Sequence, residues 1–497
     1  MLKARMLAST ELGNTNETYR QIVQELAGAY FATGDFSNAA VNYLELERAL
    51  RESNNDKTEG YALNLLKLAE TYEAAKKYGQ AARYYQSGLD LTGQLKGQAT
   101  ETYLKPLQQF ARHFTSGKRY QLAEPLYATL LQHAEAVFGA KSETALAAWF
   151  EAAEVAHHLD QHEKALALLA THLQKASRAG KKEGFLNQNF LLAAQACQQL
   201  QQPDKAADYY LNYLKTLDTA DKDGNLVEEH ERVASLLAEM GQTTPAIQAL
   251  KANLKMAENR GNTLEQATIS GKIAELHQQG GNFAEAENIL AAAVSMLQNS
   301  EHGKSAAHAG LVEQQAIIFA AAGKSQQAET TFLKAIELRH AHLGKQHQDY
   351  GTGLDHLAEF YLQQGQTEKA EKIAAEAISL KAETLGSRHH GYAESLGILA
   401  SVQENRENFE AALKLRQEQV AIEANHFGRV SEQYAAGLLK LAALYQKQQK
   451  QDEAVKIMRQ ALTIYESLGQ KGSEKYNQLQ KHIREVAADR TTAGPGN

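Results

Sequence analysis

The chain has 497 residues, a net charge of −7 at pH 7, 43 % hydrophobic residues and 5 prolines. This acidic balance argues against non-specific nucleic-acid binding and against anionic membrane surfaces, because both require a basic face. The single cysteine, Cys197, excludes an internal disulfide. Met1 to Asn16 hold no apolar run of signal-peptide length, and no segment is apolar enough to span a bilayer. We therefore expect a cytoplasmic location, although a signal peptide removed from a precursor would leave no trace here.

Residues 1–14 precede the first expected helix, and we expect this N-terminal leader to fray. From there on an alanine recurs about every 42 residues, always with a second alanine twelve positions before it. The later alanines, called anchor alanines below, are Ala39, Ala81, Ala123, Ala165, Ala206, Ala246, Ala286, Ala328, Ala370, Ala412 and Ala454. Their partners are Ala27, Ala69, Ala111, Ala153, Ala194, Ala234, Ala274, Ala316, Ala358, Ala400 and Ala442. A fixed period of this length predicts a solenoid of stacked repeats.

Apolar residues keep fixed distances from the anchors, as Tyr72, Tyr85 and Leu89 do around Ala81. Offsets of three, four, seven and eight place side chains on one face of an α-helix, so each repeat is predicted to hold two amphipathic helices. The turn between them is predicted five residues before the anchor, where five repeats carry a glycine: Gly34, Gly241, Gly281, Gly323 and Gly365. The alanines are small enough to let the two helix axes approach closely where they cross.

Further motifs carry a family resemblance. Ala123-Glu124-Pro125-Leu126-Tyr127 opens a predicted second helix, and the stretches between repeats include Leu343-Gly344 with His347, Leu385-Gly386 with His389, and Phe427-Gly428. The pattern resembles the tetratricopeptide repeat family, and its period resembles the long repeats of kinesin light chains. This resemblance implies an all-α, right-handed superhelical solenoid of about eleven helix-turn-helix repeats. It also implies a general protein-binding scaffold rather than an enzyme.

The spacing of the anchors suggests how the chain is organised. Residues 15–180 should form repeats 1–4, and residues 304–470 repeats 8–11, both with regular steps. Residues 181–303 should form repeats 5–7, where shorter steps and polar linkers predict a hinge or a change of curvature. Residues 471–489 should form a C-terminal capping helix, and residues 490–497 a disordered tail rich in Thr, Gly and Pro.

In the family, the first helix of each pair lines a concave groove that binds a partner. Here the groove-facing offsets carry about twice as many acids as bases, so we expect the partner to be a protein or peptide, with a basic segment favoured by charge. Glutamines at these offsets could hydrogen-bond a peptide backbone. The candidate groove residues are Glu70, Glu73, Gln108, Gln109, Arg112, Glu151, Glu154, Gln195, Gln198, Glu228, Glu231, Glu275, Gln278, Asp355 and Glu359.

Motifs that could carry chemistry are incomplete. Gly303-Lys304-Ser305 and Gly323-Lys324-Ser325 lack the earlier glycine and the strand of a phosphate-binding loop. Thr219 to His230 lack two strong ligands of a calcium loop. The histidines near 340 and 390 are interpreted as solvated loop residues rather than zinc ligands. We predict no catalytic residue, no cofactor site, no metal site, and no binding to nucleic acid or membrane.

The leading hypothesis is therefore a non-catalytic scaffold or adaptor that binds protein or peptide in its groove. Three alternatives stay open at this stage. The chain could be a regulator in which a peptide or a small signal changes the pitch of the solenoid, as the irregular middle suggests. It could also be the targeting subunit of an enzyme complex, or a structural solenoid that associates with itself. The sequence does not determine the oligomeric state.

Overall fold

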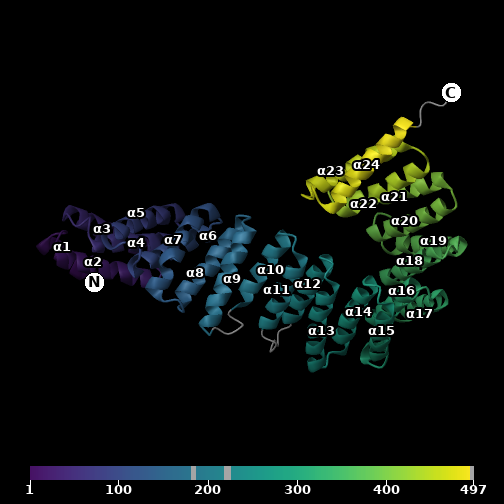
Figure 1. Cartoon of the computed structure of the whole chain (residues 1–497), viewed down its shortest axis with the longest axis horizontal. Helices are drawn as coiled ribbons and strands as arrows, with labels where there is room; N and C mark the ends of the chain where they lie inside the picture. Colours follow the sequence, from purple (N-terminus) through teal and green to yellow (C-terminus); the bar gives the residue numbers. More distant parts are fainter. Residues whose placement is uncertain (181–185, 218–224, 493–497) are drawn as a thin grey trace. The chain divides into compact units, whose positions relative to one another are not determined.

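A computed structural model describes residues 1–180, 186–217 and 225–492, and these residues form helices and turns without strands (Figure 1). The chain divides into two compact units, Met1–Ala249 and Leu250–Asn497, called unit 1 and unit 2. The boundary lies inside residues 181–303, the segment whose repeat spacing is irregular. Each unit is described separately below.

Unit 1 is a row of helix hairpins preceded by one short helix. Its helices are α1 Leu2–Leu12, α2 Glu17–Ala32, α3 Phe36–Glu52, α4 Glu59–Ala74, α5 Tyr78–Lys96, α6 Glu101–Ser116, α7 Tyr120–Phe138, α8 Glu143–His158, α9 His162–Arg178, α10 Asn187–Gln199, α11 Pro203–Thr216 and α12 Asn225–Glu239. The boundary between the units falls within α13 Thr243–Arg260.

Unit 2 repeats the same hairpin and ends on one additional helix. Its helices are α14 Thr263–Gln279, α15 Phe283–Gln298, the 3-10 turn η2 Glu301–Lys304, α16 Ala306–Ala321, α17 Ser325–Leu343, α18 Gln348–Gln363, α19 Thr367–Thr384, α20 His390–Asn405, α21 Phe409–His426, α22 Glu432–Lys447, α23 Gln451–Ser467 and α24 Glu474–Thr492. The all-α expectation is therefore confirmed.

The paired alanines lie where the two helices of each hairpin cross. Ala27, Ala69, Ala111 and Ala358 are fully buried on first helices, as are Ala39, Ala81, Ala123, Ala370 and Ala454 on second helices, and Ala442 is 1 % exposed. Tyrosines, leucines and phenylalanines fill the space beside them and join neighbouring hairpins. In unit 1 one apolar cluster runs without interruption from Ala27 on α2 to Val155 on α8. This continuity is what stacking requires, because one hairpin alone cannot bury its apolar face.

The predicted turn position is confirmed at every anchor. The residue five before each anchor alanine has a positive φ, between 54° at Gln201 and 80° at Gly34. Five of these residues are glycines, for which this conformation carries no Cβ penalty. The other six have side chains and adopt the same left-handed conformation: Lys76, Lys118, Asp160, Gln201, Glu407 and Gln449. The hairpin therefore imposes the turn even where the sequence offers no glycine.

Neighbouring hairpins also touch through their first helices. In unit 1, α8 contacts both α6 and α10, and in unit 2 the series α14, α16, α18 and α20 is in contact from one helix to the next. These contacts place the predicted groove positions of successive repeats side by side. Among the described residues, no helix combines the length and the hydrophobicity that crossing a bilayer requires.

Both ends of the chain differ from expectation. The leader is helical as α1, because Ala8 packs against Tyr19 and Val23 while the Arg5 Nη1 atom donates to Asn42 Oδ1 over 2.8 Å. These contacts offset the entropy of ordering a terminal segment. At the other end α24 continues to Thr492, past the predicted limit of 489, since no helix breaker occurs before Gly494. Residues 493–497, predicted to be disordered, lie outside the described part of the chain.

Candidate functional site

The first helices of unit 2 border a cavity of about 580 Å³. It is lined from α18, α20 and α22, with α21 supplying residues of its floor. A second cavity, of about 400 Å³, lies towards α14 and α16 and shares His356 and Glu359 with the first. The two cavities adjoin at His356 and Glu359, and together they are called the unit 2 groove below.

Two buried ion pairs lie in the wall of the unit 2 groove. Glu313 on α16 binds Arg339 on α17 in a bidentate pair, with Arg339 Nη2 donating to Glu313 Oε2 over 2.7 Å. Asp355 on α18 binds Lys381 on α19. Both pairs join the residue fifteen before an anchor alanine to the residue eleven after it. The repeats anchored by Ala328 and Ala370 therefore neutralise their groove acids internally.

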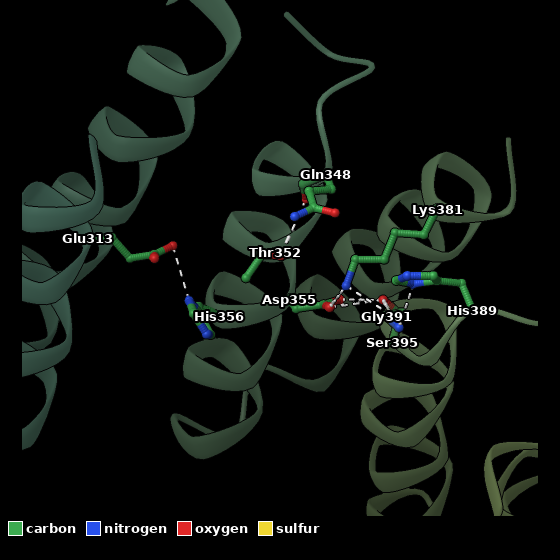
Figure 2. Close-up of polar contacts among 9 residues, drawn as sticks. All are labelled: Glu313, Gln348, Thr352, Asp355, His356, Lys381, His389, Gly391 and Ser395. Atoms are coloured by element: carbon green, nitrogen blue, oxygen red, sulfur yellow. Dashed lines mark hydrogen bonds and ion pairs between the residues drawn. The ribbon is translucent and has the colours of Figure 1, made fainter. Parts of the chain in front are cut away.

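Figure 2 shows the Asp355–Lys381 pair, and how Glu313 and this pair each reach the next first helix. Lys381 Nζ also donates to the backbone oxygen of Gly391 over 3.0 Å, and Ser395 Oγ donates to Asp355 Oδ1 over 2.7 Å. His356 Nδ1 lies 3.1 Å from Glu313 Oε1. Burial opposes ionisation of Glu313, but hydrogen bonds from Arg339 and His356 prevail and lower its pKa to about 2. The hydrogen bond to Glu313 in turn raises the pKa of His356.

The next repeat breaks this pattern. Gly397 stands fifteen before the anchor Ala412, so the acid is missing, and Glu423 stands eleven after it, where the two preceding repeats carry a cation. Glu423 Oε1 accepts a hydrogen bond from Gln419 Nε2 over 2.9 Å. Its Oε2 atom is buried and has no hydrogen-bond partner among the described residues. Burial raises the pKa of Glu423, the direction expected for a carboxylate without a bound cation.

The nearest arginine does not neutralise Glu423. Arg416 forms an ion pair of 3.1 Å with Glu404, and its Nη1 atom donates to Gln419 Oε1 over 3.0 Å. Glu404 also binds Lys447 over 2.8 Å. Gly437 on α22 leaves room for the Glu423 carboxylate, since a Cβ at that position would overlap with Oε2. The Glu423 carboxylate therefore lies at the end of a series of polar contacts from Glu404 through Arg416 and Gln419. Its Oε2 atom has no hydrogen-bond partner among the described residues.

Two exposed acids complete the lining. Glu359 and Glu394 face the 580 Å³ cavity from α18 and α20. Desolvation by the groove walls raises the pKa of Glu359, and repulsion from Asp355 and Glu394 adds to it, while His356 and Lys440 lower it. Lys440 lines the same cavity without an ion pair to any described residue. The part of the groove beyond the paired acids therefore carries an excess of negative charge.

The predicted groove residues of unit 2 differ in their exposure and in whether they line the cavities. Glu359 lines both cavities, and Gln278 lines the smaller one. Asp355 lines the larger cavity too, but it is 5 % exposed and its charge is matched by Lys381. Glu275 is exposed on α14 and accepts a hydrogen bond from Gln279. Only Glu359 among the predicted acids is thus both exposed and part of the groove cavities.

Three predicted groove residues of unit 1 bind one another, and two more bind other side chains. Glu151 on α8 accepts hydrogen bonds from Gln108 Nε2 over 3.0 Å and from Arg112 Nε over 2.8 Å, so these three residues form one cluster between α6 and α8. Glu73 accepts from Tyr85 over 2.8 Å, and Glu70 binds Lys67 over 2.6 Å.

The remaining predicted residues of unit 1 are spread over four helices. Gln198 accepts a hydrogen bond from Tyr210 over 3.1 Å. Gln109 and Glu228 are exposed, and the half-buried residues are Glu154, Gln195 and Glu231. Three of the acids predicted for the unit 1 groove, Glu70, Glu73 and Glu151, therefore bind other side chains of the protein.

Sequence reasoning missed Glu394 and Glu423. Glu423 lies on a second helix, outside the first-helix offsets that defined the candidates. Aligning the repeats on their anchor alanines could have found it. Eleven residues after the anchor, the two preceding repeats carry Arg339 and Lys381 where this repeat has Glu423. Fifteen residues before the anchor, they carry Glu313 and Asp355 where this repeat has Gly397.

The other motifs have structural roles. The Nδ1 atoms of His347 and His389 accept backbone hydrogen bonds at the starts of α18 and α20, which makes both residues N-caps. Ser305 caps α16, and Gly323 forms the turn before α17. No three His, Cys, Asp or Glu side chains converge as metal ligands within the described residues. Positions 219–224 of the calcium-like loop lie outside that part.

Comparisons with known protein families match two segments of unit 2. Family models described as tetratricopeptide repeat match residues 352–422 and 435–468. These two segments match the tetratricopeptide repeat. The matched segments include α18, α20 and α22, the helices that border the larger cavity of the unit 2 groove. A comparison with curated proteins gives no match.

Several solved structures are similar to parts of this chain or to most of it. A putative kinesin light chain from Podosopora anserina is 22 % identical, with a TM-score of 0.34 over 40 % of this chain and 94 % of that one. BtubC from P. vanneervenii is 17 % identical, with a TM-score of 0.39 over 49 % and 92 %. Yeast Tom70 is 14 % identical, with a TM-score of 0.42 over 96 % and 98 %. None of these similarities assigns a partner to this chain.

Proposed function

We propose that this tetratricopeptide repeat protein is a non-catalytic scaffold whose unit 2 groove binds a basic segment of a partner protein. The observation that carries the proposal is Glu423, a half-buried residue of the groove wall whose buried Oε2 atom lacks a partner among the described residues. A buried acceptor in this state is costly, and for a carboxylate the cost is removed most effectively by a cation.

The charges around the cavity support the same occupant. Asp355 is paired with Lys381, and Arg416 is paired with Glu404. These pairs therefore contribute little to the net electrostatic potential in the cavity. Glu359, Glu394 and Glu423 remain, against Lys440 as the one unpaired lysine among the described residues of the cavity lining. A concave surface with this excess attracts lysine and arginine side chains and speeds their association. The acidic groove expected from sequence is thus proposed for unit 2, with a different set of carboxylates.

The test uses the full chain and a fluorescein-labelled peptide of alternating lysine and alanine, with binding measured by fluorescence polarisation. Reversing the two exposed groove acids, Glu359→Lys with Glu394→Lys, should weaken binding about tenfold or more. The matched control, Glu410→Lys with Glu418→Lys, changes the net charge equally at exposed α21 residues outside both cavities. It should retain the wild-type affinity.

The third carboxylate distinguishes a specific site from a general field. Glu423→Gln keeps the size of the side chain and removes its charge. It should weaken peptide binding while Glu418→Gln should not. Equal loss of affinity in the groove and control variants would mean that net charge alone attracts the peptide, and the proposal would then be abandoned.

A further inference from the structure

One end of the larger unit 2 cavity combines aromatic rings with carboxylates. On α20, His390 and Glu394 are four residues apart, and both line the cavity. On α21, Glu423 lines the cavity, and Phe427 follows four residues later, with its backbone N–H donating to the Glu423 backbone oxygen over 2.9 Å. Residues four apart share a helix face, one turn from each other. Each helix therefore contributes one ring and one carboxylate to this region, called the aromatic end of the cavity below.

The Phe427 ring is held by its neighbours and remains partly open. Its centroid lies 5.6 Å from that of His390 and 4.6 Å from that of His426, in edge-to-face arrangements. Such arrangements are favourable for aromatic rings. Phe427 is nevertheless 38 % exposed, and it lines the cavity. It therefore offers a fixed aromatic surface to a ligand.

The two preceding repeats lack this aromatic surface. Fifteen residues after the anchor alanine they carry Leu343 and Leu385, where this repeat carries Phe427. The same two repeats neutralise their groove acids with Arg339 and Lys381. The phenylalanine thus occurs in the repeat that has no cation of its own at the corresponding position.

The charges at the aromatic end favour a cation. Glu394 is exposed and forms no ion pair with any residue that the structure describes. Burial lowers the pKa of His390, and the nearby His389 and His426 add to this effect, while Glu394 opposes it. The His390 ring is therefore largely uncharged at neutral pH, and it does not repel an incoming cation.

We propose that the aromatic end of the cavity binds the side chain of a partner arginine, whose guanidinium stacks on Phe427 and donates to the Glu394 carboxylate. A guanidinium is planar, so one face can lie against a ring while its N–H groups form a forked contact with a carboxylate. A lysine ammonium has no such plane and is more strongly hydrated. This inference rests on the function proposed above and deepens it, because an acidic groove alone does not distinguish arginine from lysine.

The test compares two fluorescein-labelled peptides of equal length and charge, one alternating lysine with alanine and the other alternating arginine with alanine. Binding to the full chain is measured by fluorescence polarisation at neutral pH. The arginine peptide should bind about fivefold more tightly, as expected for one cation–π contact at a partly desolvated site. A third peptide replaces arginine by citrulline, which is planar but uncharged, and it should bind at least about tenfold more weakly than the arginine peptide.

The decisive variant is Phe427→Leu, which introduces the residue type that the two preceding repeats carry. It should reduce the affinity for the arginine peptide about fivefold and that for the lysine peptide less than about twofold, so the preference disappears. The matched control is Phe138→Leu, which stands in the same register in unit 1 and outside the unit 2 cavities. It should retain the preference.

A second variant leaves the aromatic packing intact. Glu394→Gln, at an exposed position, removes the carboxylate of the forked contact and should also reduce the preference for arginine, whereas Glu418→Gln should not. Equal affinities of the two peptides for wild type overturn the arginine site, as does a preference that survives both Phe427→Leu and Glu394→Gln. In either case binding of the lysine peptide would still support the function proposed above. If neither peptide binds wild type, both proposals are wrong.

Discussion

The buried carboxylate of Glu313 should make unit 2 sensitive to acid. Burial opposes its ionisation, yet the hydrogen bonds from Arg339 and His356 outweigh burial and lower its pKa from the usual 4.5 to about 2. At about 1.4 kcal/mol per pKa unit, this difference corresponds to about 3 kcal/mol of stability at neutral pH. Because the folded pKa is depressed, the contribution is complete above pH 4.5 and is lost as the pH falls towards 2. About 2 kcal/mol should be gone by about pH 3.

The assay is hydrogen exchange of the α16 and α17 amides at about pH 5.5 and about pH 3, corrected for intrinsic exchange rates. Local opening is the suitable quantity, because a chain of two units need not unfold in one step. His356 has a raised pKa, so its own contribution is present below 6.5 and is lost only at higher pH. It therefore stays protonated and does not interfere between these two pH values.

The matched variants are Glu313→Gln and Glu410→Gln. Glu313→Gln leaves Arg339 buried without its carboxylate, which should cost about 3–5 kcal/mol at the higher pH. This variant should then lose about 2 kcal/mol less than wild type on going to the lower pH. Glu410→Gln, at an exposed position, should behave as wild type. An identical acid response in Glu313→Gln and wild type would refute this account of the pair.

Three further predictions concern packing and turns, and chemical denaturation followed by circular dichroism can measure each. Ala358→Leu should cost about 1–3 kcal/mol, because this alanine is fully buried at a helix crossing. Tyr361→Ala should cost about 3–5 kcal/mol, since the ring is 5 % exposed and its hydroxyl donates to Glu329 over 2.8 Å. Glu407→Gly should stabilise by about 0.5–1 kcal/mol by relieving a positive φ of 60°, whereas Gly365→Ala should destabilise by a similar amount. A loss of stability in Glu407→Gly, or equal costs for Ala358→Leu and an exposed change such as Gln109→Ala, would contradict the assigned register.

The periodicity of the sequence was sufficient to predict the hairpins. Side chains at offsets of three, four, seven and eight share a helix face in any α-helix, so a repeated pattern specifies which face is buried. The alanines Ala69 and Ala81 illustrate this, as do the turn glycines such as Gly34. The α1 helix was not predicted because no repeat position covers Leu2–Leu12, and its stability comes from contacts with α2 and α3 rather than from local pattern.

The availability of groove residues was decided only by tertiary structure. Asp355 and Glu359 looked equivalent in sequence, yet Lys381 from the following helix neutralises the first and leaves the second exposed. Helical periodicity determines the face on which a side chain lies, whereas its partners depend on reach and packing between helices far apart in sequence. Glu423 matters for the same reason, because the ion pair formed at its position in the two preceding repeats is absent there. The sequence by itself determined the repeating scaffold, and the packing of its helices decided which polar atoms remain for a partner.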